Sequence, residues 1–420
     1  MNDKNTIFLI PMRYEDFNAF TAAAASSALW EHTPREQVMP RYLLNYASNI
    51  AANSNLFQSF SLKDPGSLDV YMFGEEVPLE TPPCLKEVRL SCFSTGIGFL
   101  GFHVSYDPAV TVEQVANFSY YFKKAAKITP REPMAGKYSL YTVAGRILPQ
   151  DAHLFFTAAT PFKYECLCYH YMHLDENYDR EKNDARMVLL KRSYHTNFLE
   201  QFANDCDMRY APYTYDHWGG SSEGFANITY NANNEFTDYF LNNLKKSHQE
   251  VDYYFMYLLL LLQRFTAIKH ITEIAEENDA PAYRLDKLNR QIITLKTVFT
   301  FNIISNDRVY QDVYSKMYQV LDIEQLLKDV LDNEGQMEVV QNMRSVKNDK
   351  LSNKFLFGLS VLSLFSALID ASSYFDRFDS VRPASTILSL VCTSLIVLSC
   401  LAWILRSQGD KKDKSRKKQK

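Results

Sequence analysis

The side chains best arranged for chemistry lie in an apolar segment near the end of the chain, residues 355–375. On a helical wheel its polar residues share one flank: Ser360, Ser363, Ser366, Asp370 and Ser373. Rings of carboxylates select cations, and apolar constrictions close pores by dewetting. We therefore predict a pore, formed by a ring of subunits, with Asp376 and Asp379 at its outer mouth. The predicted pore-lining residues are Leu356, Leu359, Ser363, Ser366, Asp370 and Ser373.

The role of Asp370 depends on where this membrane helix ends. The 15 uncharged residues Phe355 to Ile369 would form a helix of about 22 Å, which is shorter than the ~30 Å hydrocarbon core of a bilayer. Extended to Phe375, the helix reaches about 31 Å and fits. We therefore place Asp370 inside the span, where an ionisable group indicates function because lipid exposure is costly. Alternatively, Asp370 ends a short helix at the headgroups, and the serines bond to their own backbone or pack helices closely.

A second uncharged segment, residues 384–405, is long enough to span a bilayer without such help. Basic residues are frequent before the first span and in the tail, residues 407–420, whereas the loop between the spans has only Arg377 and Arg382. Basic residues stay on the cytoplasmic side. We therefore predict a multi-pass protein of the cell (inner) membrane with both termini in the cytoplasm and a tail that binds lipid headgroups.

A glycine-rich stretch, "HWGGSSEGF", is a weaker candidate for ligand binding. It could hold a nucleotide by ring stacking and by backbone N–H groups directed at phosphate; an ordinary surface loop is the alternative. The candidate contacts are Trp218, Gly219, Gly220, Ser221 and Ser222. A second glycine-rich stretch, "STGIGFLG", lies between two predicted strands and lacks the Lys-Ser/Thr of a phosphate loop, so it predicts a β-hairpin turn.

The stretch "CLCYHYMH" contains four residues of the types that bind zinc: Cys166, Cys168, His170 and His173. Strand alternation would turn His173 away from the other three, so a buried strand is favoured and the metal, if any, is unassigned. We find no nucleophile-elbow, kinase, metalloprotease or deaminase motif. The sequence therefore predicts a protein that is not an enzyme and that carries no covalent cofactor.

Bulk composition limits the partners. The mean hydropathy of -0.26 confines the membrane part to the C-terminal segments, and a net charge of -4 argues against a general nucleic-acid binder. Seven scattered cysteines suggest no disulfide framework, and the N-terminus does not read as a signal peptide. These features fit a chain that is exposed to the cytosol.

The elements needed to position these groups form an α+β protein in four parts. Residues 1–232 predict a mixed α/β cytosolic, sensor-like domain, with strands at 87–93, 98–106 and 164–174, further period-two stretches at 137–148 and 153–159, and a helix starting near residue 111. Residues 233–350 predict a helical stalk, in which the apolar run 253–262 is too short to span a bilayer. Residues 351–406 hold the two spans, at about 355–375 and 384–405, and residues 407–420 the tail. A single helix from Arg308 to Ile369 would be about 93 Å long and would need partner copies, which predicts a homo-oligomer.

This organisation resembles the CorA-type divalent-cation channels, which are funnel-shaped homopentamers whose first span lines the pore. Their Gly-Met-Asn signature is absent, and "ASSYFDRFDS" takes its place. The stretches "RLSCFSTGIGFLGFHVSYDP" and "FTFNIISNDRVYQDVYSKMYQVLDIEQLLKDV" are similar to divergent CorA-like effectors that accompany type III CRISPR systems. This resemblance implies a homopentamer whose cytosolic domain senses a nucleotide messenger, such as a conjugate of S-adenosylmethionine and AMP.

Three functions therefore compete. The first is a membrane effector of antiviral (type III CRISPR) defence, a CorA-like ion channel or membrane-permeabilising pore gated by a nucleotide second messenger. The second is a CorA-type divalent metal cation (magnesium) transporter, and the third is a non-conducting, membrane-anchored sensor. Asp370 and the polar stripe favour the first two, and the missing signature favours the first over the second.

Overall fold

The computed structural model describes residues 2–68, 79–123, 140–155, 166–202, 207–276, 290 and 293–330. The chain divides into two compact units, Met1–Asn333 and Glu334–Lys420, and every described residue belongs to the first. The two predicted membrane helices, the basic tail and all predicted pore and outer-mouth residues, including Asp370, lie outside the described residues. Within the described ranges, no helix is both long enough and apolar enough to cross a bilayer.

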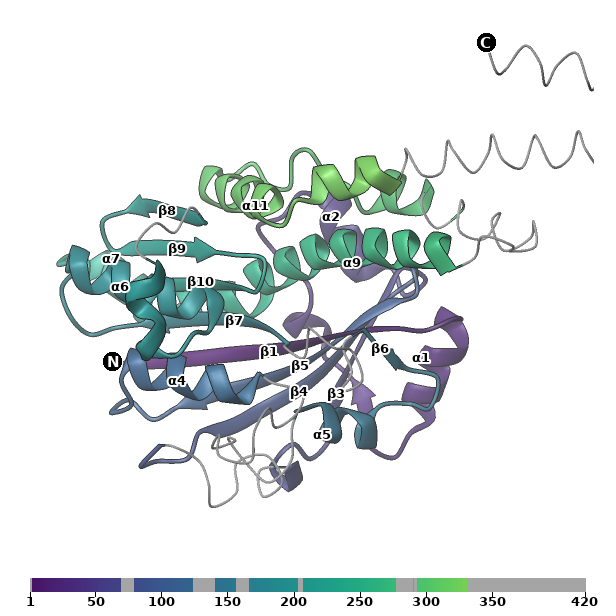
Figure 1. Cartoon of the computed structure of the whole chain (residues 1–420), viewed down its shortest axis with the longest axis horizontal. Coiled ribbons are helices and arrows are strands. Elements are labelled where there is room, and N and C mark those ends of the chain that lie inside the picture. Colours follow the sequence, from purple (N-terminus) through teal and green to yellow (C-terminus); the bar gives the residue numbers. More distant parts are fainter. Residues whose placement is uncertain are drawn as a thin grey trace, which may run out of the picture. The chain divides into compact units, whose positions relative to one another are not determined.

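The described residues form a ten-stranded mixed sheet with helices on both faces (Figure 1). The strand order is β2-β3-β4-β5-β1-β7-β10-β9-β8, and β6 pairs with β1 off this path. Every pairing is antiparallel except that of β7 with β10, which is parallel. The strands are β1 Asp3–Arg13, β2 Trp30–His32, β3 Phe57–Leu62, β4 Cys84–Phe93, β5 Ile97–Tyr106, β6 His153–Leu154, β7 Leu167–His173, β8 Met208–Tyr213, β9 Asp216–Gly220 and β10 Gly224–Thr229.

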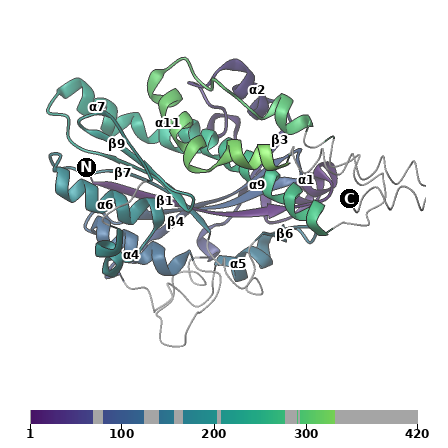
Figure 2. The ribbon, with the colours of Figure 1, turned by 45° about the horizontal axis from the view of Figure 1, so that its top comes forward.

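Successive side chains of the central strand β1 point to opposite faces of the sheet and contribute to two hydrophobic cores. Phe8 and Ile10 point into one core, whereas Ile7 and Leu9 point into the other, as strand geometry requires. The first core lies under α1 (Phe17–Ser26), α4 (Val112–Phe122), α5 (Leu140–Ile147) and α6 (Arg180–Arg192). The second lies under α2 (Asn45–Ala52), α9 (Tyr254–Glu276) and α11 (Arg308–Val320), and the two helical layers flank the sheet (Figure 2).

Several elements predicted from the sequence are confirmed. The strands β4 and β5 form a hairpin whose turn contains Gly96 at φ 79°, a conformation that favours glycine. Helix α4 begins with a capping box between Thr111 and Gln114. The period-two interpretation of residues 137–148 is wrong where the structure describes them, because α5 covers 140–147. Leu140, Val143 and Ile147 recur at helical spacing and are buried.

The apolar run 253–262 is buried between neighbours, as predicted: the end of η3 and the first turns of α9 lie between the sheet and α11. The described helices between residues 232 and 330 therefore belong to the same compact unit as the sheet. A single helix from Arg308 onward is wrong in its described part, because α11 ends at Val320. Asp322 has a left-handed φ of 51°, which ends the helix, and the flanking Leu321 and Ile323 are buried in the core.

The remaining elements are short. They are η1 (Arg35–Gln37), η2 (Thr196–Phe202), α7 (Glu235–Asn243), α8 (Lys245–Ser247) and the π-helical turn η3 (His248–Tyr253). The last three join β10 to α9 without an intervening loop of more than a few residues. They therefore cross one end of the sheet, where β1 begins and where α7 lies in Figure 1.

Candidate functional site

A pocket of about 290 Å³ lies where three strand ends meet the α7–η3 segment. Because β7 and β10 are parallel and β1 is antiparallel to β7, the carboxyl ends of β7 and β10 lie beside the amino end of β1. The crevice outside the carboxyl ends of parallel strands is where α/β sheets commonly bind ligands. The lining residues are Asp3, Asn5, Lys86, Tyr171, Met172, His173, Asn227, Thr229, Leu241, Asn242, Lys245, Lys246 and Gln249.

Strand register arranges the floor of this pocket in two rows. Tyr171 of β7 pairs with Asn5 of β1 and with Asn227 of β10. Two residues further along β7, His173 pairs with Asp3 and with Thr229 of the same two strands. Residues two apart on a strand share a face, so both rows lie on the face that carries α9. The floor therefore presents amide, hydroxyl, imidazole and carboxylate groups together.

A buried hydrogen-bond chain forms the wall behind the pocket. The Gln249 amide Nε2 donates to Asn227 Oδ1 at 2.8 Å, and Asn227 Nδ2 donates to Asp216 Oδ1 at 2.6 Å. The other Asp216 oxygen accepts from Lys245 Nζ at 2.9 Å. The hydroxyl of Tyr169 also donates to the Gln249 side chain. Because buried polar groups are costly unless paired, this satisfied chain holds Gln249 and Lys245 in fixed positions.

The mouth of the pocket carries a second ion pair. Lys246 Nζ lies 2.7 Å from Asp3 Oδ2, and Asn5 Nδ2 donates to the other Asp3 oxygen at 3.0 Å. Burial alone would raise the pKa of Asp3, but the Lys246 ammonium outweighs it and the pKa lies below its ordinary value. The lining residues contain three lysines, of which Lys245 and Lys246 are paired with Asp216 and Asp3, so an anionic occupant would share these two ammonium groups with the carboxylates.

His173 offers a hydrogen-bonding atom that is not used within the described structure. Its Nδ1 lies 3.1 Å from Thr229 Oγ1, and that hydroxyl donates to the Met172 carbonyl at 3.1 Å. The single hydroxyl proton is thereby occupied, so Nδ1 must be the donor and Nε2 carries a lone pair. This Nε2 is buried and has no partner among the described residues. Burial lowers the pKa of His173, which keeps that lone pair available to an N–H donor.

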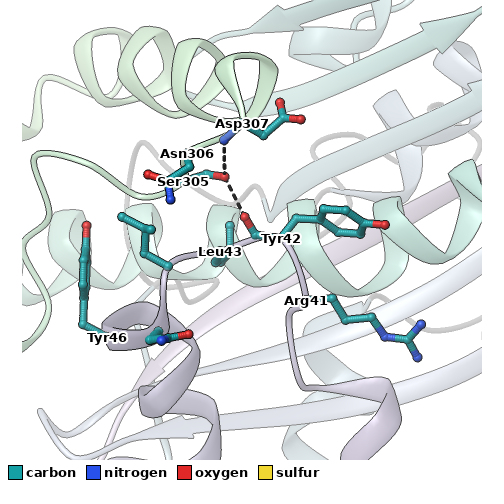
Figure 3. A pocket seen from close by; sticks show the side chains of 9 residues that line it. Arg41, Tyr42, Leu43, Tyr46, Ser305, Asn306 and Asp307 are labelled. Carbon is teal, nitrogen blue, oxygen red and sulfur yellow. Dashed lines mark hydrogen bonds between the residues drawn. The ribbon is translucent and has the colours of Figure 1, made fainter.

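A wider cavity of about 520 Å³ lies between residues 41–46 and residues 305–307 (Figure 3). Ser305 Oγ donates to the Tyr42 carbonyl at 2.6 Å and accepts from the Asp307 amide at 3.1 Å. Its tyrosines, Tyr42 and Tyr46, are exposed. None of its lining residues has a buried polar atom left unpaired in the described structure. The chemistry therefore favours the smaller pocket as the ligand site.

The weak sequence candidate for ligand binding is not a loop. Trp218, Gly219 and Gly220 belong to β9, and Ser221 and Ser222 form the turn to β10. The Trp218 ring is buried, with centroids 4.4 Å from the Tyr253 ring and 5.3 Å from the Phe225 ring. A base that stacked there would have to displace one of these rings.

The glycines and serines of this stretch are used in packing. A Cβ on Gly219 would collide with Met187 of α6, and one on Gly220 with Met317 of α11. Ser221 Oγ donates to the Lys191 carbonyl at 2.7 Å, whereas Ser222 is exposed and its carbonyl accepts from Arg264. The stretch lies one layer behind the pocket, since Lys245 is 5.1 Å from the Trp218 ring centroid and lines the pocket itself.

The cysteine and histidine stretch is a buried strand, as predicted. His170 bonds Thr6 and Ser193 at 2.8 Å through its two ring nitrogens, which satisfies it as a structural residue. Cys166 and Cys168 lie in the first core. In the part of the chain that the structure describes, no group of three or more His, Cys, Asp or Glu could hold a metal ion.

Sequence reasoning missed most of the pocket. Asp3, Asn5, Lys245, Lys246 and Gln249 are common surface residue types, and no local pattern marks them. The one available signal was the polar run "LKKSHQE", residues 244–250, which directly follows helix α7. Comparison with protein-family models and with curated proteins finds no match for this chain.

Proposed function

We propose that this chain is a membrane effector whose sheet unit binds a small nucleotide-type ligand and thereby gates its C-terminal hairpin. The observation that carries the ligand-binding part is the strand-end pocket, whose lining includes Lys245, Lys246 and His173, a histidine whose Nε2 has no hydrogen-bond partner among the described residues. The hairpin part rests on the sequence of residues 355–405.

The pocket chemistry matches the parts of a nucleotide. Lysine ammonium groups bind phosphate as point charges. Amide side chains, here Asn5, Asn227 and Gln249, can donate to and accept from the edge of a base. The lone pair of His173 Nε2 suits an exocyclic amine, which supplies an N–H. At about 290 Å³, the pocket is just below the range for small-molecule sites, ~300–1,000 Å³.

The membrane part of the proposal follows from the predicted spans and from the CorA-like resemblance. A homopentamer would place Asp370 of each subunit around one axis and would turn the serine stripe towards a pore. By that resemblance the effector belongs to type III CRISPR defence, and its ligand is a messenger such as an S-adenosylmethionine–AMP conjugate. A ligand opens such a pore only if it binds the open state more tightly than the closed one.

Titration calorimetry on the full-length protein tests the binding step. The probes are AMP, ATP, S-adenosylmethionine and a synthetic conjugate of S-adenosylmethionine with AMP. We expect at least one to bind with micromolar or tighter affinity. Lys246→Ala should weaken that binding about tenfold or more, because a hydrogen bond to a charged group contributes ~1.5–3 kcal/mol.

Lys63→Ala is the matched control. Lys63 is exposed, and its ammonium donates to the Ala28 carbonyl at 3.1 Å, outside the pocket. Its removal should leave the affinity unchanged. Equal weakening by both substitutions would show that the lysines act only through net charge. Absence of binding by all four probes would contradict the proposal and leave the transporter as the better interpretation.

A further inference from the structure

We propose that the π-helical turn η3 couples the strand-end pocket to helix α11, so that occupancy of the pocket alters the packing of α11 and of the chain that follows it up to residue 330. The proposal rests on the proposed function only in assuming that a ligand occupies the pocket. The contacts of η3 themselves are independent of any ligand, and they divide between two sides.

One side of η3 faces the pocket. Gln249 lines the pocket and donates to Asn227 at 2.8 Å. Glu250 accepts from the hydroxyl of Tyr171, another lining residue, at 2.8 Å. A ligand that takes an amide of Asn227 or Gln249, or that moves the Tyr171 ring, must therefore act on these two consecutive residues of the turn.

The other side of η3 faces α11. His248 Nδ1 lies 2.8 Å from the Tyr310 hydroxyl. The ring of Tyr253, at the end of the same turn, stacks on the Tyr310 ring with centroids 4.2 Å apart and planes 4° from parallel. Tyr310 lies in the first turn of α11 and is buried. Residues at both ends of η3 therefore hold one residue of α11.

The same turn also anchors the loop beside α11. Asp252 accepts the backbone N–H groups of Arg41 and Tyr42 at 2.6 and 3.0 Å. The Tyr42 ring stacks on His248 with centroids 4.5 Å apart. Figure 3 shows how Ser305, just before α11, bonds the Tyr42 carbonyl in turn. Movement of η3 would therefore reach the start of α11 by two routes, one direct and one through this loop.

A π turn is suited to this role because it holds one more residue than an α turn. Such turns occur mostly as single insertions in helices, frequently at functional sites. Conversion of η3 to α-helix would rotate residues 248–250 by about 100° relative to 252–253. That rotation would break the Gln249–Asn227 and His248–Tyr310 bonds together, so an α-helical form of the turn would be a second arrangement that has neither bond.

A double-mutant cycle on the full-length protein tests the coupling without a ligand. Gln249→Ala removes the pocket-side bond, and Tyr310→Phe removes the hydroxyl that meets His248. Urea unfolding of the sheet unit is followed by tryptophan fluorescence. We expect the unfolding constant of the double variant to differ at least about threefold from the product of the single effects, because only coupled sites depart from additivity.

Asn5→Ala paired with Tyr310→Phe is the control cycle. Asn5 also lines the pocket, but its side-chain amide donates to Asp3, which is not part of η3. The effects of Asn5→Ala and Tyr310→Phe on the unfolding constant should therefore be independent, so that the double variant shows the product of the two single effects. If the unfolding constant of the Gln249→Ala, Tyr310→Phe double variant also equals the product of the single effects, the coupling is refuted. If Gln249→Ala does not fold, Glu250→Ala, a half-buried residue of the same turn, takes its place.

Hydrogen exchange gives a second readout. Gln249→Ala should accelerate amide exchange in residues 305–321, whereas Asn5→Ala should not. Unchanged exchange in both variants would overturn the coupling. Because neither experiment uses a nucleotide, a failure of coupling is distinguishable from a failure of nucleotide binding in calorimetry.

Discussion

The ammonium nitrogen of Lys245 lies 2.9 Å from a carboxylate oxygen of Asp216, and both side chains are almost completely buried. The same ammonium lies 5.1 Å from the centroid of the Trp218 ring and 5.4 Å from that of Tyr253. This pair connects β9 to α8, at the wall of the pocket. A buried ion pair is not by itself strong evidence for stability, but loss of one partner leaves an uncompensated charge.

We therefore expect Asp216→Asn to destabilise the sheet unit by about 3–5 kcal/mol, measured by urea unfolding. Asp184→Asn is the matched control, because Asp184 pairs with Arg209 at the surface. The side chains of Asp184 and Arg209 are 42% and 41% exposed. Exposed pairs contribute ~0–1 kcal/mol. Equal effects of the two substitutions would mean that burial does not govern the Asp216 pair.

The glycine-rich stretch after Trp218 gives a second prediction. Gly219→Ala would bring its methyl group into the side chain of Met187, and overpacking in a core costs ~1–3 kcal/mol. Gly145→Ala is the opposite case, since nothing lies within 4 Å of its Cβ position and the residue is inside helix α5. That change should stabilise by about 0.4–1 kcal/mol. Thermal unfolding should show a lower melting temperature for Gly219→Ala and a higher one for Gly145→Ala. An unchanged melting temperature of Gly219→Ala would argue against a packing role for Gly219.

Acid should destabilise the sheet unit. Burial lowers the pKa of His103 to about 4 despite the nearby Glu87. Burial would raise the pKa of Glu87, but His103 and Arg89 together lower it to about 2. As pH falls from 6.5 towards 4, the unfolded chain binds a proton that native His103 excludes, so stability falls. Below 4.5, protonation of Glu87 in the unfolded chain adds a further loss.

His103→Gln should therefore flatten the pH dependence near pH 5 by up to about 1.4 kcal/mol per pH unit, the value for one proton. The measurement is urea unfolding at a series of pH values from 4 to 7. His153→Gln serves as the control because His153 is exposed on β6. If stability depends on pH equally in the wild type and in His103→Gln, His103 is not the origin of the pH dependence.

The sequence predicted elements with a strong local signal and failed where tertiary packing decides. Alternation identified β4, β5 and β7, and the helical stretch after residue 111 identified α4. The period-two interpretation of 137–148 failed because Tyr141, Val143 and Ile147 fit a two-residue period, whereas the buried residues Leu140, Val143 and Ile147 follow the helical one. The pocket could not be predicted because Asp3 and His173 are 170 residues apart in sequence and meet only through strand register. Trp218 was assigned to a ligand-binding loop because its neighbouring glycines resemble those of a phosphate loop. In the structure, these glycines make room for the side chains of Met187 and Met317.

The most direct test of the membrane prediction concerns Asp370. In a ring of subunits, several carboxylates at close range would attract cations and repel anions. Asp370→Asn keeps the shape and removes the charge, so the preference for cations over anions should fall sharply. Reversal potentials across liposomes that contain the full-length protein, with the conjugate of S-adenosylmethionine and AMP added, measure this preference.

Two further substitutions separate a pore-lining carboxylate from a peripheral one. Asp376→Asn should have a smaller effect, because charges at the wider mouth are screened by salt over about 8 Å. Leu359→Ala should widen the apolar constriction and increase leak in the absence of the conjugate. If Asp370→Asn leaves both conductance and selectivity unchanged, the aspartate ends a short helix at the headgroups. The serine stripe would then be explained by helix packing alone.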